Sequence, residues 1–141
     1  MCNNAQFIVH RYLINQNYNN TMNKILITGG AGFVGSHLTE YLSKKNKIIV
    51  IDNLSHGNKI HNLNKNIKLI KGDIRDGDLL NFYSRNCTSI FHLAAVLGVD
   101  IVSKKNVETM ECEFEGIQNV CHAAKRNKIS KFNDIETDKS K

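Results

Sequence analysis

Short apolar runs recur along the chain and predict the strands of a buried sheet. The first covers 24–28 and ends at a glycine cluster, and similar runs follow at 47–51, 67–71 and 89–93. Such runs, bounded by polar turn residues, are typical of strands that are covered on both faces. We therefore predict four buried strands, and a fifth that begins at Ile129 and fails after Phe132.

Amphipathic stretches between these runs predict helices. The first helix is expected to pack through one stripe with helical spacing, made of Val34, Leu38, Tyr41, Leu42 and the aliphatic stem of Lys45. Asp76 is placed to cap a helix that runs through Leu79, Leu80 and Tyr83. A long helix over 106–126 is expected to bury Met110, Phe114, Ile117, Cys121 and Ala124.

This alternation of strands and helices predicts an α/β fold, with a parallel sheet and helices on both of its faces. Residues 22–132 are expected to form the domain. A disordered, Asn-rich extension is expected over 1–21 and a frayed tail over 133–141. Because the fifth strand is expected to be truncated, the strand over 89–93 is predicted to lie at or near an edge of the sheet.

The loop between the first strand and the first helix, Thr28-Gly-Gly-Ala-Gly-Phe-Val-Gly35, is rich in glycine. In a dinucleotide-binding loop, Gly29 would make the sharp turn, Gly32 would let a pyrophosphate approach the backbone, and Gly35 would let the helix pack closely on the strand. The helix N-terminus offers free N–H groups and a positive dipole end to phosphates. A Walker A loop would need a lysine after the last glycine, but serine and histidine follow here. We predict a Rossmann-type dinucleotide-binding sheet with strand order 3-2-1-4, and the alternative is a purely structural glycine turn.

Asp52 ends the second strand, and its position favours NAD as the cofactor. A carboxylate there can accept hydrogen bonds from both hydroxyls of the adenosine ribose, and it would repel the 2′-phosphate of NADP. No arginine lies near the glycine loop or just after Asp52 to offset that repulsion. The alternative is that Asp52 only shapes the turn before Asn53.

Composition and charge argue against several other classes of protein. The net charge is +6, but the basic residues are mostly dispersed lysines, so no nucleic-acid partner is expected. No apolar run approaches the roughly 18 residues of a membrane span, and the stretch 7–14 is interrupted by His10 and Arg11, so neither a span nor a secretory leader is expected. The 4 cysteines show no CxxC spacing, which indicates reduced thiols, no metal site and a cytoplasmic location.

Four motifs occur along the chain in the order that is known from one superfamily. They are the loop Thr28–Gly35, Asp52-Asn-Leu-Ser-His-Gly57, Gly72-Asp-Ile-Arg-Asp76 and His92-Leu-Ala-Ala95. Over about residues 23–132 the chain resembles the extended short-chain dehydrogenase/reductase superfamily. More narrowly, it resembles the NAD-dependent nucleotide-sugar epimerases and dehydratases of UDP-glucose 4-epimerase type.

The resemblance implies a position for each part of NAD. The pyrophosphate would lie along Gly29, Gly32, Phe33, Val34 and Gly35. The adenosine ribose and its surroundings would contact Asp52, Asn53 and Ser55, and the adenine would be flanked by Asp73 and Ile74. The strand-four side of the cofactor would contact Leu93, Ala94 and Ala95. Cys112 stands where many relatives carry an asparagine near the cofactor, and we interpret it as a small buried side chain rather than a nucleophile.

The catalytic groups of this family, a Tyr-x-x-x-Lys pair and a Ser or Thr, are expected to lie beyond the part of the chain that carries the resemblance. The only such spacing here, Tyr41 to Lys45, falls on the packing stripe of the first helix, so no catalytic residue is assigned. We predict the NAD-binding portion of an epimerase or dehydratase. Its complete form would bind a nucleotide sugar and form a homodimer through 106–126. The alternatives are a non-catalytic NAD-binding sensor or scaffold, and a non-functional gene fragment.

Overall fold

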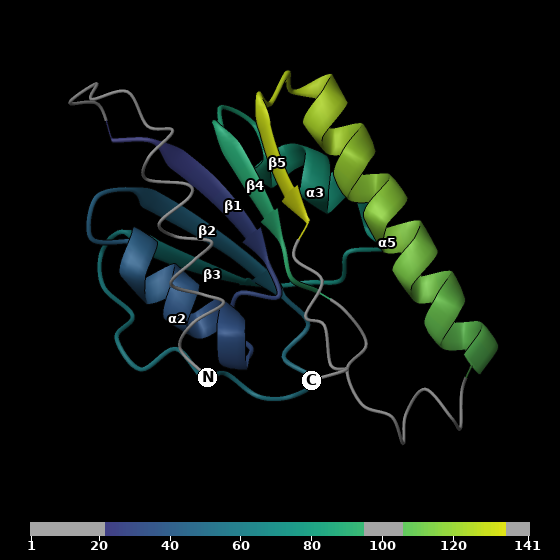
Figure 1. The fold of residues 1–141 in the computed structure, drawn as a ribbon, viewed down its shortest axis with the longest axis horizontal. Coiled ribbons are helices and arrows are strands. Elements are labelled where there is room, and N and C mark those ends of the chain that lie inside the picture. The colour runs from purple at the N-terminus through teal and green to yellow at the C-terminus, as the bar shows by residue number, and fades with distance from the viewer. Residues whose placement is uncertain (1–21, 95–105, 135–141) are drawn as a thin grey trace.

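A computed structural model describes residues 22–94 and 106–134, which build one parallel sheet (Figure 1). The strands are β1 (Lys24–Thr28), β2 (Lys47–Asp52), β3 (Ile67–Lys71), β4 (Ser89–His92) and β5 (Lys131–Asp134). Their order in the sheet is β3-β2-β1-β4-β5, and every neighbouring pair is parallel. The predicted order of the first four strands is therefore confirmed.

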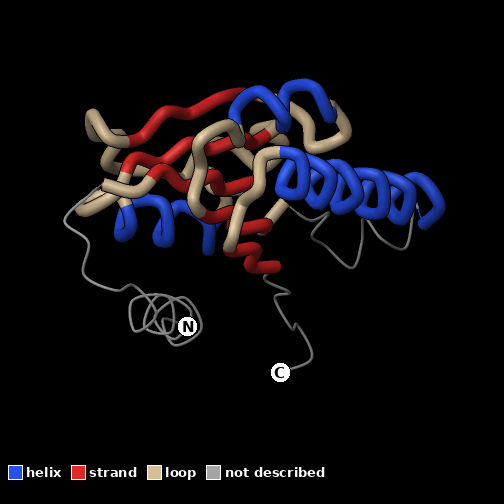
Figure 2. Tube along the Cα trace, turned by 90° about the horizontal axis from the view of Figure 1, so that it is seen from above, coloured by secondary structure: helices blue, strands red, loops and turns tan. Residues whose placement is uncertain are grey.

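Helices cover both faces of the sheet, as Figure 2 shows from above. One face carries α2 (Phe33–Leu42), and the opposite face carries α3 (Gly77–Tyr83) and α5 (Asn106–Arg126). Asp76 caps α3, because its carboxylate accepts a hydrogen bond of 2.9 Å from the backbone N–H of Leu79. Within the ranges that the structure describes, no helix is both long enough and apolar enough to cross a membrane.

Two apolar clusters form the core, one on each face of the central strands. Successive residues of β1 alternate between them: Ile25 and Ile27 pack toward α2, whereas Leu26 packs toward α3 and α5. These side chains are fully buried. Burying each one contributes about 1.5–3 kcal/mol. The continuous apolar runs of the sequence thus follow from strands that are covered on both sides.

The fifth strand differs from the expectation. It was predicted to begin at Ile129 and to fail after Phe132, but β5 covers Lys131–Asp134 and pairs with the whole of β4. β4 therefore lies near an edge of the sheet and not at it, because it stands between β1 and the edge strand β5. Pairing at a sheet edge depends on backbone hydrogen bonds, so it tolerates the polar residues that the sequence has there.

The predicted buried stripe of α2 is only partly correct. Leu38 and Leu42 are buried, but Tyr41 is 42% exposed and Lys45 is exposed as well. The other buried positions of α2 are small residues, among them Thr39, whose hydroxyl donates to the carbonyl of Gly30 at 3.2 Å. Small side chains with satisfied hydroxyls let this helix lie close to the glycine-rich loop.

In α5 most of the predicted stripe is not the buried one, although Ala124 of that stripe packs against the core. Met110 and Phe114 are 69% and 65% exposed, and Cys121 is exposed, whereas Thr109, Val120 and Ala123 are buried. The predicted set and the buried set both have helical spacing, and they are offset from each other by about one residue in the sequence. Apolar periodicity alone does not tell which of two such sets is buried. The smaller side chains face the core because α5 packs closely against α3.

The thiol of Cys87 makes stability depend on pH in alkaline solution. Burial raises the pKa of Cys87 from 9.0 to about 11, so above pH 9 the unfolded chain loses this proton before the folded chain does. We expect the free energy of unfolding to fall between pH 9 and 11, and to fall less in Cys87→Ala. Urea unfolding at pH 8 and pH 10.5 measures this difference.

Cys121→Ala serves as the matched control for this prediction, because Cys121 is exposed. It should keep the full pH dependence of the wild-type chain. An equal pH dependence in Cys87→Ala and in the wild type would contradict the role that is assigned to Cys87.

Candidate dinucleotide-binding site

The glycine-rich loop leaves β1 through a turn that requires Gly29. This residue has φ +71°, and its N–H donates to the carbonyl of Ile51 at 2.8 Å. A Cβ at Gly29 would lie 2.6 Å from the backbone nitrogen of Ala94, which is too close for any side chain. The turn thus brings the end of β1 against the residues that follow β4.

The first turn of α2 faces the same region without a capping side chain. Gly32 is the N-cap residue and offers no side chain to cap the helix, and the first turn contains no acidic residue. The backbone N–H groups and the positive end of the helix dipole therefore remain available to an anion. A phosphate is the ligand that such a helix start binds most readily.

Asp52, at the end of β2, links this loop to the segment that follows β2. Its Oδ2 accepts a hydrogen bond from the N–H of Ala31 at 3.0 Å, and its Oδ1 accepts one from the N–H of Leu54 at 2.8 Å. Each carboxylate oxygen has a further lone pair. The half-buried carboxylate lines the cavity described next, so it can accept hydrogen bonds from a ligand while it holds both loops.

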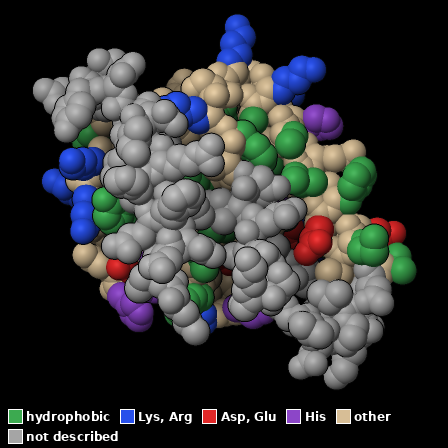
Figure 3. All heavy atoms as spheres, in the orientation of Figure 1, with side chains coloured by type: hydrophobic (Ala, Val, Ile, Leu, Met, Phe, Trp, Pro, Cys, Tyr) green, Lys and Arg blue, Asp and Glu red, His purple; other side chains and the backbone are tan. Residues whose placement is uncertain are grey.

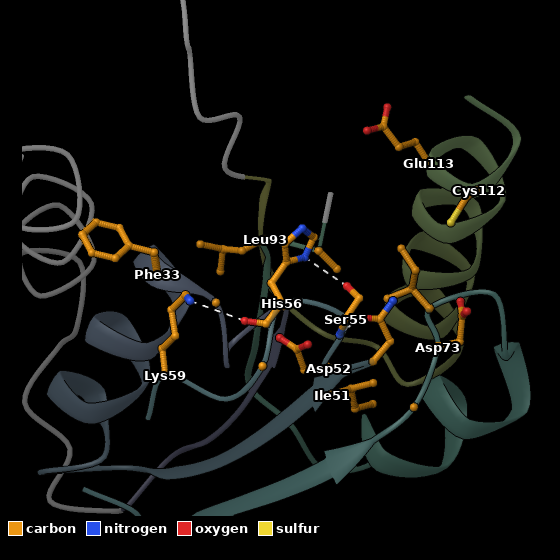
Figure 4. A pocket seen from close by; sticks show the side chains of 17 residues that line it. Phe33, Ile51, Asp52, Ser55, His56, Lys59, Asp73, Leu93, Cys112 and Glu113 are labelled. Atoms are coloured by element: carbon orange, nitrogen blue, oxygen red, sulfur yellow. Dashed lines mark hydrogen bonds between the residues drawn. The ribbon is translucent and has the colours of Figure 1, made fainter. Parts of the chain in front are cut away.

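A cavity of about 300 Å³ lies at the carboxyl ends of the strands. Figure 4 shows Phe33 and Lys59 on one side of it, Asp73 and Cys112 on the other, and Asp52 between them. Ligands of parallel α/β sheets bind at this end of the strands, where the strand order reverses. The shape is therefore that of an elongated site that runs from the start of α2 across to α5.

Most of the residues predicted to bind the cofactor meet in this cavity. Its lining includes Gly29, Gly32, Phe33, Asp52, Asn53, Ser55, Asp73, Ile74, Leu93 and Ala94. Val34 and Gly35 do not line it. Gly35 instead permits the close packing expected of it, because a Cβ there would collide with the carbonyl oxygen of Gly29. Ala95 lies outside the described residues.

Other lining residues were not among the predicted site residues. They are Ile51, His56, Gly57, Lys59, Gly72, Cys112 and Glu113. The segment that follows Asp52 folds back onto the glycine loop, where the N–H of Lys59 donates to the carbonyl of Ala31 at 2.9 Å. Within the described ranges, Lys59 is the one lysine or arginine that lines the cavity. Its nearness to the Asp52 motif could have revealed it, whereas no sequence pattern indicates Glu113.

The loop after β3 carries a carboxylate at the far end of the cavity. Arg75 donates to Asp73 through Nε and through one terminal guanidinium nitrogen, the latter at 2.7 Å. These hydrogen bonds hold the pKa of Asp73 below its usual value. Burial raises the pKa of the neighbouring Cys112 thiol, which disfavours the nucleophilic thiolate. Cys112 is only half-buried and lines the cavity, so it is less buried than predicted.

The helix α5 fixes the backbone of this loop. The amide nitrogen of Asn119 donates to the carbonyls of Ile74 at 3.2 Å and of Arg75 at 2.9 Å. These bonds tie the end of the cavity to the core, because α5 is anchored there by buried residues.

The sequence of residues 25–139 matches the model of the NAD dependent epimerase/dehydratase family. The chain is 41% identical over 125 residues to a dTDP-D-glucose 4,6-dehydratase of Dictyostelium discoideum, covering 82% of this chain and 29% of the relative. It is 40% identical over 108 residues to a UDP-N-acetyl-alpha-D-glucosaminuronate decarboxylase of Bacillus cytotoxicus, covering 74% of this chain and 34% of the relative. The chain thus spans about a third of the length of these relatives.

Solved structures agree with the sequence matches. A UDP-N-acetylglucosamine 4-epimerase of Methanobrevibacter ruminantium superimposes with a TM-score of 0.74 at 31% identity, covering 79% of this chain and 37% of that one. A UDP-glucose 4-epimerase of Thermus thermophilus in complex with NAD superimposes with a TM-score of 0.67 at 29% identity, covering 77% of this chain and 36% of that one. The predicted Rossmann-type fold and the resemblance to epimerases and dehydratases are thereby confirmed.

Proposed function

Because this chain belongs to the NAD dependent epimerase/dehydratase family, we propose that it forms the NAD-binding part of an enzyme that moves hydride between a sugar carbon and NAD. The observation that carries the proposal is the position of Asp52, whose carboxylate lines the cavity while it holds the glycine-rich loop through Ala31. A carboxylate beside an uncapped helix start fits a ribose that is attached to a diphosphate. When bound, NAD supplies the hydride acceptor and donor.

We propose that NAD lies along the cavity with its diphosphate at the first turn of α2. Gly32 and Phe33 offer backbone there, and the ammonium group of Lys59 lies on the same side of the cavity (Figure 4). Asp52 would accept from the ribose hydroxyls, with Asn53 and Ser55 beside it. The adenine would extend toward Asp73 and Ile74, and the nicotinamide half toward Leu93 and Ala94.

The substrate that we propose for the complete protein is a sugar linked to UDP or dTDP. The names of the relatives support this class, since they include a dTDP-D-glucose dehydratase and UDP-sugar enzymes. The chain supplies the cofactor side of the reaction in this proposal. The matches cover about a third of the relatives' length.

Calorimetric titration of the purified chain with NAD and with NADP tests the cofactor assignment. Binding of NAD with weaker or absent binding of NADP is expected, because Asp52 would face the 2′-phosphate. Tighter binding of NADP than of NAD would refute the assignment.

We expect no sugar-dependent turnover from the purified 141-residue chain. Within the described residues no tyrosine lines the cavity, and Tyr41 of the one Tyr-x-x-x-Lys spacing lies exposed on α2. The measurement is product formation from UDP-glucose and dTDP-glucose with added NAD. Turnover that is present in the wild-type chain and lost in Asp52→Ala would contradict this expectation, because contaminating host enzymes would be unaffected by the substitution.

We also propose that the protein forms a homodimer through α5. Three large apolar residues share one stripe of this helix: Val107, Met110 and Phe114, which are 71%, 69% and 65% exposed. Hydrophobic side chains gather over α5 on the face that Figure 3 shows. Two copies related by a two-fold axis would bury the same stripe on each chain.

Phe114→Glu is expected to weaken this dimer by about 2–4 kcal/mol, roughly 30- to 1000-fold in the dimer dissociation constant, because it places a charge in an apolar interface. Light scattering coupled to size-exclusion chromatography measures the change. His122→Glu, which adds a charge at another exposed position of α5, is the control and should leave the dimer intact. A wild-type chain that is monomeric at high micromolar concentration would contradict the proposal.

A further inference from the structure

The Asp73 carboxylate is partly exposed, and yet its position is fixed by several hydrogen bonds. Its side chain is 35% exposed and lines the cavity, yet three N–H groups of Arg75 donate to it, and the Nε–H group is shared between both oxygens. About one of the roughly four lone-pair sites of the carboxylate is left for a ligand. One of the hydrogen bonds comes from the backbone N–H of Arg75 at 2.8 Å, and the others come from the guanidinium group. A guanidinium group that contacts both oxygens fixes the plane of a carboxylate, which a single point charge does not do.

Arg75 is in turn held by contacts with α5. Its carbonyl accepts a hydrogen bond from Asn119 of α5 at 2.9 Å, and Glu115 of the same helix adds a smaller favourable electrostatic interaction with its guanidinium. The backbone on which both Asp73 and Arg75 lie is therefore tied to a helix that is anchored in the core. The result is a carboxylate with a fixed direction and a fixed charge at one end of the cavity.

A carboxylate that stays ionised can only accept hydrogen bonds. It is complementary to the 6-amino group of adenine, which donates two N–H bonds. It opposes the 6-oxo group of hypoxanthine, whose oxygen is an acceptor. The preference for adenine over hypoxanthine requires that the carboxylate keeps its direction. A carboxylate that is free to rotate can turn toward solvent when hypoxanthine is bound, and it then no longer opposes that base.

We infer that Arg75 is a specificity-determining positioning residue, which makes the cavity select a 6-aminopurine over a 6-oxopurine by fixing the Asp73 carboxylate. The inference rests on the proposed binding of NAD with its adenine at Asp73. Arg75 itself does not line the cavity, so it acts through Asp73 rather than by touching the base.

The experiment compares the affinities of NAD and nicotinamide hypoxanthine dinucleotide, which differ only in the base. The wild-type chain is expected to prefer NAD by at least about tenfold. In Arg75→Gln the preference should fall to about threefold or less, because NAD loses affinity and the hypoxanthine analogue does not. Arg75→Lys keeps the positive charge but lacks the planar guanidinium group that contacts both carboxylate oxygens, so it should retain part of the preference for NAD.

Arg85→Gln is the matched control. Arg85 is exposed, lies over the ring of Phe82 at 5.5 Å and does not line the cavity. It should keep the full preference for NAD. A purely structural role of Arg75 would weaken both dinucleotides equally, so an unchanged ratio in Arg75→Gln overturns the inference while the NAD proposal stands. A wild-type chain that binds neither dinucleotide overturns both.

Discussion

Replacing Asp52 with alanine is expected to weaken NAD binding by about 1–3 kcal/mol, which is roughly 5- to 150-fold in Kd. The substitution removes the acceptor for the ribose hydroxyls. It also releases the N–H groups of Ala31 and Leu54, which the carboxylate holds at 3.0 and 2.8 Å. Calorimetric titration of the variant with NAD measures the loss.

The same variant should discriminate less between NAD and NADP, because the charge that opposes the 2′-phosphate is gone. Asp78→Ala is the control, since it removes one negative charge from an exposed position of α3 that does not line the cavity. An affinity of Asp52→Ala for NAD within twofold of the wild type would show that the carboxylate does not contact the cofactor.

Gly29→Ala should lower the free energy of unfolding by about 2–5 kcal/mol. An alanine at φ +71° costs about 1–2 kcal/mol by its conformation alone. Its Cβ would also lie 2.6 Å from the nitrogen and 2.8 Å from the Cα of Ala94, and crowding of this kind costs about 1–3 kcal/mol more. Urea unfolding followed by circular dichroism measures the change.

Gly57→Ala separates the two contributions. Gly57 has nearly the same backbone conformation, φ +75°, but nothing lies within 4 Å of a Cβ placed there. It should therefore cost only the conformational part, about 1–2 kcal/mol. Equal losses of stability in Gly29→Ala and Gly57→Ala would contradict the close approach of β1 and the residues after β4.

The strands could be predicted from the sequence because the interior of a parallel sheet demands continuous apolar runs. Ile25 to Ile27 and Ile48 to Ile51 are covered on both faces, so each run is unambiguous. The end of β5 could not be predicted, because Asn133 and Asp134 pair with β4 through their backbones, whatever their side chains. The buried face of α5 was missed because the exposed stripe with Met110 and Phe114 has the same period as the buried one and larger side chains.

The site could be predicted where a motif lies next to a strand end. Asp52 and the glycine-rich loop belong to neighbouring strands whose carboxyl ends meet, so their contact follows from the strand order. Lys59 and Glu113 reach the cavity only through the fold-back of a loop and the packing of α5. The nearness of Lys59 to the Asp52 motif was a usable signal, whereas the position of Glu113 depends on tertiary contacts that no local pattern encodes.

The most direct test of the account is to observe the backbone amides by NMR during a titration with NAD. Shifts are expected first at Ala31, Gly32 and Phe33, together with Leu54, which shares the Asp52 carboxylate with Ala31. The amides of residues 37–42, farther along α2, should shift little. Amides of the glycine-rich loop that do not shift at millimolar NAD, in a folded chain, would contradict the claim that this loop and Asp52 bind the cofactor.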